Sequence, residues 1–261
     1  MDRHCVGGGD SMSAAIDLHD LTVTYERRPA VHHVSGRFAA GSLTAIVGPN
    51  GAGKSTLIKA IAGTLKPAIG RVDRGSLATR HIGYLPQAAE IDRSFPLSVA
   101  DTVMMGAWRS IGAFRGATRQ HAQQAQEALK AVGLEGFEGR SISSLSSGQF
   151  QRVLFARLLL QDASVILLDE PFTAIDARTT RDLLALISTW HGQGRTVIAV
   201  LHDIEQVRQH FPSTLLLARE TIAWGNTADI LHADNLRRAK NMAEHWSPDA
   251  QACEAEQEQT L

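Results

Sequence analysis

Residues 48–56 read GPNGAGKST, and this stretch constrains the fold more than any other part of the chain. Its spacing matches the G-x-x-x-x-G-K-[S/T] phosphate-binding loop, which requires a strand before it and a helix after it. The apolar end of residues 38–48 and the helix-forming residues 55–65 meet both requirements. The three glycines let the backbone approach phosphate oxygens closely, so that its N–H groups form an anion nest. The stretch therefore predicts an α/β nucleotide-binding core.

The same loop carries the charge and the hydroxyl group that a nucleotide needs. Lys54 is expected to place a positive charge on the β- and γ-phosphates, and Ser55 to offer its hydroxyl to Mg²⁺. A glycine-rich turn with a solvated lysine is the alternative, but it leaves the flanking strand and helix unexplained. We therefore expect nine consecutive residues to contact ATP: Gly48, Pro49, Asn50, Gly51, Ala52, Gly53, Lys54, Ser55 and Thr56.

Two carboxylates end a later apolar run. VILLDEP, at residues 165–171, is typical of a strand buried in a parallel sheet up to Asp169 and Glu170. Ligands bind at the carboxyl ends of such strands, so we expect Asp169 to hold Mg²⁺ and Glu170 to orient or deprotonate the attacking water. His202 ends the apolar run 195–203 and is expected to contact the γ-phosphate. The alternative is that these residues only mark strand ends.

The remaining pattern alternates between strands and helices. Strand-like runs occur at residues 16–25, 38–48, 82–87, 164–170 and 195–203. Helical patterns occur at residues 98–108, 117–131 and 143–160, and again at 227–246. Residues 213–225 read as a hairpin. This order indicates an α/β core interrupted by a helical insertion at about residues 88–160.

The composition narrows the class of protein. The chain has 261 residues, 44% hydrophobic and 20% charged, with a net charge of −1, which favours a folded protein and gives no general electrostatic case for nucleic acid. No apolar run is long enough to cross a bilayer, so we expect no membrane span in this chain. Cys5 and Cys253 lack C-x-x-C partners, which argues against a structural disulfide or zinc site. The adjacent His32 and His33 should point to opposite faces of a strand.

The chain resembles the nucleotide-binding subunits of ABC transporters, because six elements occur in the order found in that family. They are GPNGAGKS, Gln87 in YLPQ, LSSGQ at 145–149, LLDEP, Asp176 in AIDA and His202 in VLHD. The resemblance covers about residues 14–232. It implies an ATPase that hydrolyses ATP to ADP and phosphate, with ATP and Mg²⁺ as cofactors.

The resemblance also implies the architecture. We expect a P-loop NTPase core of the α/β class, with an antiparallel β subdomain and an inserted α-helical subdomain. The ATP-binding domain should span residues 14–246, with its helical insertion at about 88–160. Residues 1–13 are expected to be a disordered leader and residues 247–261 an acidic disordered tail.

The LSSGQ signature implies a second copy of the chain. In the family this segment reaches the γ-phosphate held by the opposite subunit, which implies that Ser146, Ser147, Gly148 and Gln149 contact the ATP of a partner in a head-to-tail homodimer. Glycine is usual where this chain has Ser147, and serine restricts φ, so turnover or closure could change in either direction. An ordinary helix capped by serine is the local alternative, but it does not explain the other five elements.

Three further positions take their roles from the resemblance. Gln87 is implied to contact Mg²⁺ or the attacking water and to link the core to the helical insertion. Tyr25 is implied to stack on adenine, and Asp176 to couple the two sites across the dimer. The alternatives are a polar strand end for Gln87, a surface tyrosine for Tyr25 and a helix N-cap for Asp176.

The resemblance also implies the partners. A separate integral membrane permease would dock on the helical insertion around SFPLSVADTVMMGAW, residues 94–108. The stretch 84–108 is similar to the zinc and manganese importer branch, which implies an extracytoplasmic metal-binding protein in the same system. The chain would then lie at the cytoplasmic face of the inner membrane as a peripheral subunit.

Other functions remain open at this point. The chain could power import of another substrate, such as iron chelates, or act as a soluble non-transport ABC ATPase on DNA or the ribosome. A P-loop kinase is a third class, but it would not explain LSSGQ or His202. Only about 60 residues separate Gln87 from Gly148 and there is one phosphate loop, which favours a transporter subunit without a nucleic-acid partner.

Overall fold

The computed structural model describes residues 14–25, 28–112 and 116–245. The expected leader, the expected tail and both cysteines lie outside these ranges, so the expectations about them stay predictions.

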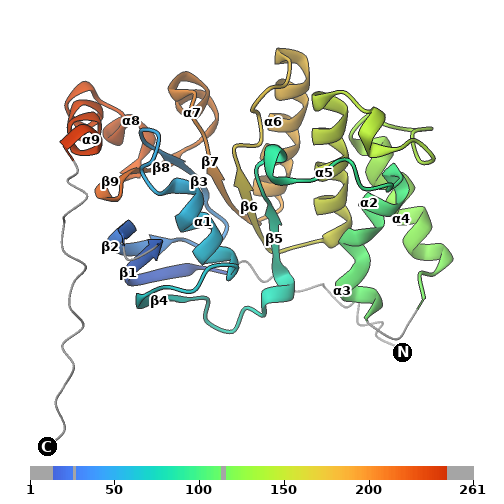
Figure 1. Cartoon of the computed structure of the whole chain (residues 1–261), viewed down its shortest axis with the longest axis horizontal. Helices are drawn as coiled ribbons and strands as arrows, with labels where there is room; N and C mark the ends of the chain where they lie inside the picture. Colours follow the sequence, from blue (N-terminus) through green and yellow to red (C-terminus); the bar gives the residue numbers. More distant parts are fainter. Residues whose placement is uncertain (1–13, 26–27, 113–115, 246–261) are drawn as a thin grey trace, which may run out of the picture.

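A six-stranded sheet forms the centre of the molecule (Figure 1). Its strands, in spatial order, are β5 (Ile82–Leu85), β6 (Val165–Asp169), β7 (Thr196–Val200), β3 (Leu43–Val47), β8 (Ser213–Ala218) and β9 (Glu220–Asn226). All neighbours are parallel except β8 and β9, which form the expected hairpin. Because parallel strands share one carboxyl edge, β3, β6 and β7 bring their following loops together. The predicted α/β core is confirmed.

A second, three-stranded antiparallel sheet has the order β2-β1-β4. It comprises β1 (Ile16–Tyr25), β2 (Arg28–Phe38) and β4 (Ile69–Asp73). Helix α1 (Lys54–Ala62) packs its apolar residues into the same buried cluster as this sheet and the central one. The phosphate-binding loop, which ends at α1, is therefore fixed between the two sheets.

The expectation that His32 and His33 point to opposite faces is wrong. Their rings are in edge contact, with centroids 4.2 Å apart. The strand does not alternate regularly here, because His33 has a left-handed φ of 49° and the pairing of β1 with β2 contains bulges. His32 pairs with Glu220 at 2.8 Å, and His33 pairs with Asp20 at 2.6 Å.

Within the described residues, four α-helices lie between β5 and β6 and occupy one end of the molecule (Figure 1). They are α2 (Val99–Met104), α3 (Trp108–Ile111), α4 (Arg119–Ala131) and α5 (Ser147–Gln161). The predicted continuous helix 98–108 is divided by a 3-10 turn at Met105–Ala107. Gly106 in that turn approaches α5 closely, since a Cβ there would lie 2.2 Å from the carbonyl oxygen of Arg157.

The remaining helices cover the central sheet and end the described chain. They are α6 (Ala177–Gly192), α7 (Ile204–His210), α8 (Thr227–Ile230) and α9 (Ala233–His245). The predicted helix 227–246 is thus divided into α8 and α9. None of the helices in the described ranges is long and apolar enough to cross a membrane.

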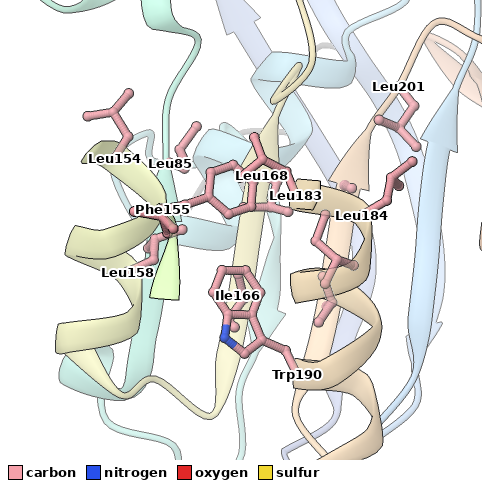
Figure 2. Close-up of a cluster of buried hydrophobic side chains, with 14 of the residues drawn as sticks. Leu85, Leu154, Phe155, Leu158, Ile166, Leu168, Leu183, Leu184, Trp190 and Leu201 are labelled. Atoms are coloured by element: carbon pink, nitrogen blue, oxygen red, sulfur yellow. The ribbon is translucent and has the colours of Figure 1, made fainter. Parts of the chain in front are cut away.

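Helices α5 and α6 are anchored by a large apolar cluster (Figure 2). Phe155 of α5 stacks on Trp190 of α6, with ring centroids 5.6 Å apart and planes 5° apart. Leu158 of α5 lies in the same cluster as Ile166 and Leu168 of strand β6, and all three are almost completely buried. Such close packing makes α5 a rigid support for the signature residues at its N-terminal end.

Candidate active site

The phosphate-binding loop requires glycine at two places where the chain comes close to other backbone. A Cβ on Gly48 would lie 1.9 Å from the carbonyl oxygen of Leu217, and one on Gly53 would lie 2.1 Å from that of Ala30. Gly53 also has a left-handed φ of 86° and immediately precedes α1. These contacts, one from β8 and one from β2, bring the loop backbone into the shape that surrounds a phosphate.

Lys54 is folded into the centre of its own loop. Its Nζ donates to the carbonyl oxygens of Gly48 and Pro49, both at 2.9 Å. Burial lowers the pKa of the Lys54 ammonium, while the nearby carboxylates of Glu170 and Asp169 act in the opposite direction. A phosphate oxygen can replace one carbonyl as the partner of this ammonium with little movement of the side chain, which fits the predicted role of Lys54.

Ser55 and Asp169 form an oxygen pair that fits Mg²⁺. The Ser55 hydroxyl donates to Oδ1 of Asp169 at 2.9 Å, while Oδ2 of Asp169 is buried and has no hydrogen-bond partner among the described residues. Burial is the main reason that the pKa of Asp169 is raised to about 6. Mg²⁺ prefers oxygen ligands and is usually held by one or two protein groups together with phosphates and water. A cation at Oδ2 would compensate the buried charge.

Glu170 is held by side chains from three segments. Its carboxylate accepts from Nε2 of Gln87 at 2.5 Å and from the Thr173 hydroxyl at 3.3 Å, and it lies 2.5 Å from Nε2 of His202. Its backbone has a φ of 49°, a left-handed conformation that costs a non-glycine residue about 1 to 2 kcal/mol. Strain of this kind often marks a functional position. The carboxylate is thereby aimed at the edge of the phosphate loop.

These groups surround one cleft of about 410 Å³. It is lined by Ala30, by residues 50–56 and by Glu170 and His202. A larger cavity of about 650 Å³ lies on the other side of Glu170 and His202, between α6 and α7. The smaller cleft is the better phosphate site, because it alone of these two contains the glycine loop and the lysine. A carboxylate beside bound phosphate can take a proton from water, which is the chemistry of nucleotide hydrolysis.

The signature residues are at the N-terminal end of α5, and they do not line the phosphate cleft of their own chain. Ser146 is the N-cap of α5, and it forms a reciprocal capping box with Gln149, with distances of 3.0 and 3.2 Å. Ser147 does not line the phosphate cleft of its own chain; it lines a separate cavity of about 510 Å³ with Gln87. By helix geometry the N–H groups of Ser147 and Gly148 have no intrahelical partner, so they can bind an anion presented by another molecule.

Asp176 is not among the residues that line the cleft. Asp176 caps α6, where its carboxylate accepts from the N–H groups of Arg178 and Thr179 and from the Thr179 hydroxyl. The bonds from Thr179 are the main reason that the pKa of Asp176 is lowered. The structure describes the backbone of Tyr25 at the end of β1, but its side chain is outside the described part.

Sequence reasoning missed three contributors to the site. Thr173 binds the Glu170 carboxylate, Ala30 lines the cleft, and the Arg219 N–H donates to the Ala52 carbonyl oxygen at 2.9 Å. Thr173 could have been suspected because it lies three residues after Glu170. Nothing local marks Ala30 or Arg219, because both reach the loop through pairing between distant strands.

The sequence has relatives among proteins of known class. The ABC transporter family profile matches residues 31–173. The zinc transport system ATP-binding protein of Treponema pallidum is 40% identical over 229 residues, or 86% of each chain. The manganese transport system ATP-binding protein of Bacillus subtilis is 39% identical over 228 residues, which cover 85% of this chain and 91% of that protein.

Solved structures agree with these relatives. An ABC transporter in an inward-facing conformation superposes with a TM-score of 0.78 at 30% identity, covering 87% of this chain and 89% of that one. A bacterial ABC transporter cassette solved as a dimer has a TM-score of 0.72 at 28% identity, covering 81% and 98%. Sequence, fold and relatives therefore lead to one conclusion: the chain belongs to the ABC transporter family.

Proposed function

We propose that this chain is the ATP-hydrolysing subunit of an ABC transporter that imports a divalent metal ion, zinc or manganese, through a separate membrane permease. The observation that carries the choice of metal is the 40% identity with a zinc transport subunit and the 39% identity with a manganese transport subunit, both over most of the chain. ATP binding and hydrolysis follow from membership of the family, and the phosphate cleft supplies the groups that this chemistry needs.

Hydrolysis would proceed with Glu170 as the general base. Gln87 and His202 hold its carboxylate from two sides, so it can take the proton of a water that attacks the γ-phosphate. The loop N–H groups and Lys54 stabilise the negative charge on the phosphates. Ser55 and Asp169 would hold Mg²⁺, which supplies further charge neutralisation when bound. The same proposal includes Mg²⁺ contact by Gln87, γ-phosphate contact by His202 and adenine stacking on Tyr25.

The complete site would need two copies of the chain. Ser147 and Gly148 are separated from their own phosphate cleft and present free helix N–H groups, which suits a nucleotide held by a partner copy. Asp176 lies beside this helix tip, since a Cβ on Gly148 would be 3.5 Å from Oδ2 of Asp176. That position supports a role for Asp176 in coupling the two nucleotide sites of a head-to-tail homodimer.

A surface on the helical insertion supports the permease as partner. Phe95, Met105 and Trp108 are exposed by 61%, 43% and 68%, which is unusual for large apolar side chains. Met105 and Trp108 line a cavity of about 500 Å³ together with Tyr84 and Arg157. A permease docked there would place the chain at the cytoplasmic face of the membrane, and an extracytoplasmic binding protein would deliver the metal.

Metal uptake tests the proposal. Cells lacking the chain should take up less ⁶⁵Zn or ⁵⁴Mn, and the wild-type chain should restore uptake. Lys54→Ala should leave uptake at the level of cells without the chain, because the ammonium at the centre of the phosphate loop is lost. Unchanged uptake of both metals without the chain would overturn the assignment of a metal substrate.

The competing functions give different results in the same cells. If uptake of an iron chelate falls while zinc and manganese uptake is normal, the chain serves another importer. If the chain copurifies with ribosomes or DNA and with no membrane permease, it is a non-transport ATPase.

A further inference from the structure

Arg93 connects the segment after Gln87 to the turn that precedes the signature. Its Nη2 donates to the carbonyl oxygen of Ile142 at 3.1 Å and also to that of Leu145. Its guanidinium carbon lies 4.8 Å from the ring centroid of Phe150, in the first turn of α5. Three contacts from one half-buried side chain therefore converge on the N-terminal end of this helix.

The Arg93 guanidinium donates to backbone carbonyl oxygens of this turn and not to a carboxylate of the described residues. Within the described ranges no carboxylate pairs with Arg93; the neighbouring Asp92 accepts from Ser94 instead. A planar guanidinium can bond carbonyl oxygens at its edge while its face stacks on an aromatic ring, whereas a lysine ammonium has no planar face to stack. The site therefore makes use of properties specific to arginine.

The Leu145–Ser146 peptide is held from both sides. In a trans peptide the C=O and N–H groups point in opposite directions, so fixing one fixes the other. Arg93 holds the Leu145 carbonyl oxygen, and Oε1 of Gln149 accepts from the Ser146 N–H at 3.0 Å. Together they set the plane of the peptide that leads into Ser146, the N-cap of α5, and hence the direction from which the chain enters the first turn.

The geometry points to Arg93 as a positioning residue, which holds the signature turn so that the N–H groups of Ser147 and Gly148 face the nucleotide of a partner copy. This inference rests on the proposed two-copy ATPase. Because Arg93 is not among the residues that line the phosphate cleft of its own chain, its loss should leave the first nucleotide contact intact and impair the step that needs the partner.

The test compares Arg93→Ala and Arg93→Lys in the full chain. Two quantities are measured: the affinity of the single chain for a fluorescent ATP analogue, and kcat for ATP hydrolysis. We expect unchanged affinity and a kcat lower by about tenfold or more for both variants, because a hydrogen bond to a charged group is lost at the turn. Combined with Glu170→Gln, either variant should also dimerise at higher ATP concentration than Glu170→Gln alone, by size-exclusion chromatography.

Arg140→Ala is the matched control. The Arg140 guanidinium also lies over an aromatic ring, 3.9 Å from the centroid of Phe137, but among the described residues its side chain makes no hydrogen bond to the signature turn. It should keep wild-type kcat and dimerisation. If Arg93→Ala fails to fold, shown by lost nucleotide affinity, Arg93→Lys carries the test. Wild-type kcat in the folded Arg93 variants overturns the inference, whereas a Glu170→Gln chain that never dimerises overturns the two-copy site itself.

Discussion

The phosphate loop and the signature turn are held in opposite ways. The loop lies between two sheets, and backbone from β2 and β8 approaches two of its glycines so closely that no side chain fits. The signature turn lies at the exposed tip of α5, held by its own capping box and by Arg93. Of the proposed two-part site, one part is thus built into the core, and the other is carried on the helices between β5 and β6.

The different support of the loop and of the signature turn suggests a different task for each. The loop has its lysine and serine on α1 and the Asp169 carboxylate at the end of β6, all within one chain, which suits phosphate binding by a single copy. A turn carried on a separate group of helices can be moved relative to that core. We therefore expect nucleotide binding to belong to one copy and hydrolysis to require two.

Glu170→Gln separates these tasks with the largest effect. The amide keeps the shape of the side chain but cannot take a proton, so kcat should fall by about 100- to 10,000-fold while ATP affinity is retained. With ATP and Mg²⁺ the variant should accumulate as a closed dimer, measured by light scattering. A variant that binds ATP and remains monomeric would contradict the expectation that one copy binds the nucleotide and two copies hydrolyse it.

Asp169→Asn tests the role of the buried Asp169 carboxylate beside the phosphate loop. The pKa of Asp169 is raised from its usual 3.8 to about 6, so the folded chain holds its proton more tightly than the unfolded chain. The associated stability is present below pH 4 and lost as the pH rises through 6. At pH 7 the variant should therefore be more stable than wild type without nucleotide, by about 1 to 2 kcal/mol.

Denaturant unfolding at pH 7 and pH 4 measures this difference, which should disappear at pH 4. Added Mg²⁺ and ATP should then stabilise the wild type more than the variant, because the variant lacks the carboxylate oxygen that would face the cation. Equal stabilisation of both chains by Mg²⁺ and ATP would argue against Asp169 as a metal ligand.

Ser147→Gly tests the exposed half and should have the smallest effect. The side chain is exposed at the first position of α5, so replacing it with the glycine that the family usually has should change stability by about 1 kcal/mol or less. Turnover should stay within about threefold of wild type in a steady-state ATPase assay. Complete loss of hydrolysis would show that the serine hydroxyl has a role of its own.

Local sequence was sufficient wherever one short segment carries a function. The glycine loop, the apolar run before Asp169 and the serine before α5 are each recognisable within ten residues, and the structure places them in the predicted elements. Strands β2 and β4 could not be predicted in this way. β2 contains an early proline and a bulge at His33, and β4 contains a left-handed glycine and is largely exposed.

Contacts between distant segments were also beyond local reasoning. Arg93 and Arg219 have ordinary neighbours in the sequence, and their partners become apparent only when the loops meet in space. Helix ends were misplaced for a similar reason. The break after Met104 depends on how closely Gly106 approaches α5, which no periodicity in residues 98–108 reveals.

The turn between β8 and β9 makes a contact with consequences for every catalytic cycle. Arg219 donates its N–H to the Ala52 carbonyl oxygen and its guanidinium to the Pro29 carbonyl oxygen, so it ties the phosphate loop to β2. A loop braced from outside keeps its form as ATP enters and as ADP leaves. Little ordering entropy would then be lost on phosphate binding, and in the proposed two-copy transporter more of the binding energy would remain available to draw in the second copy and to move the permease.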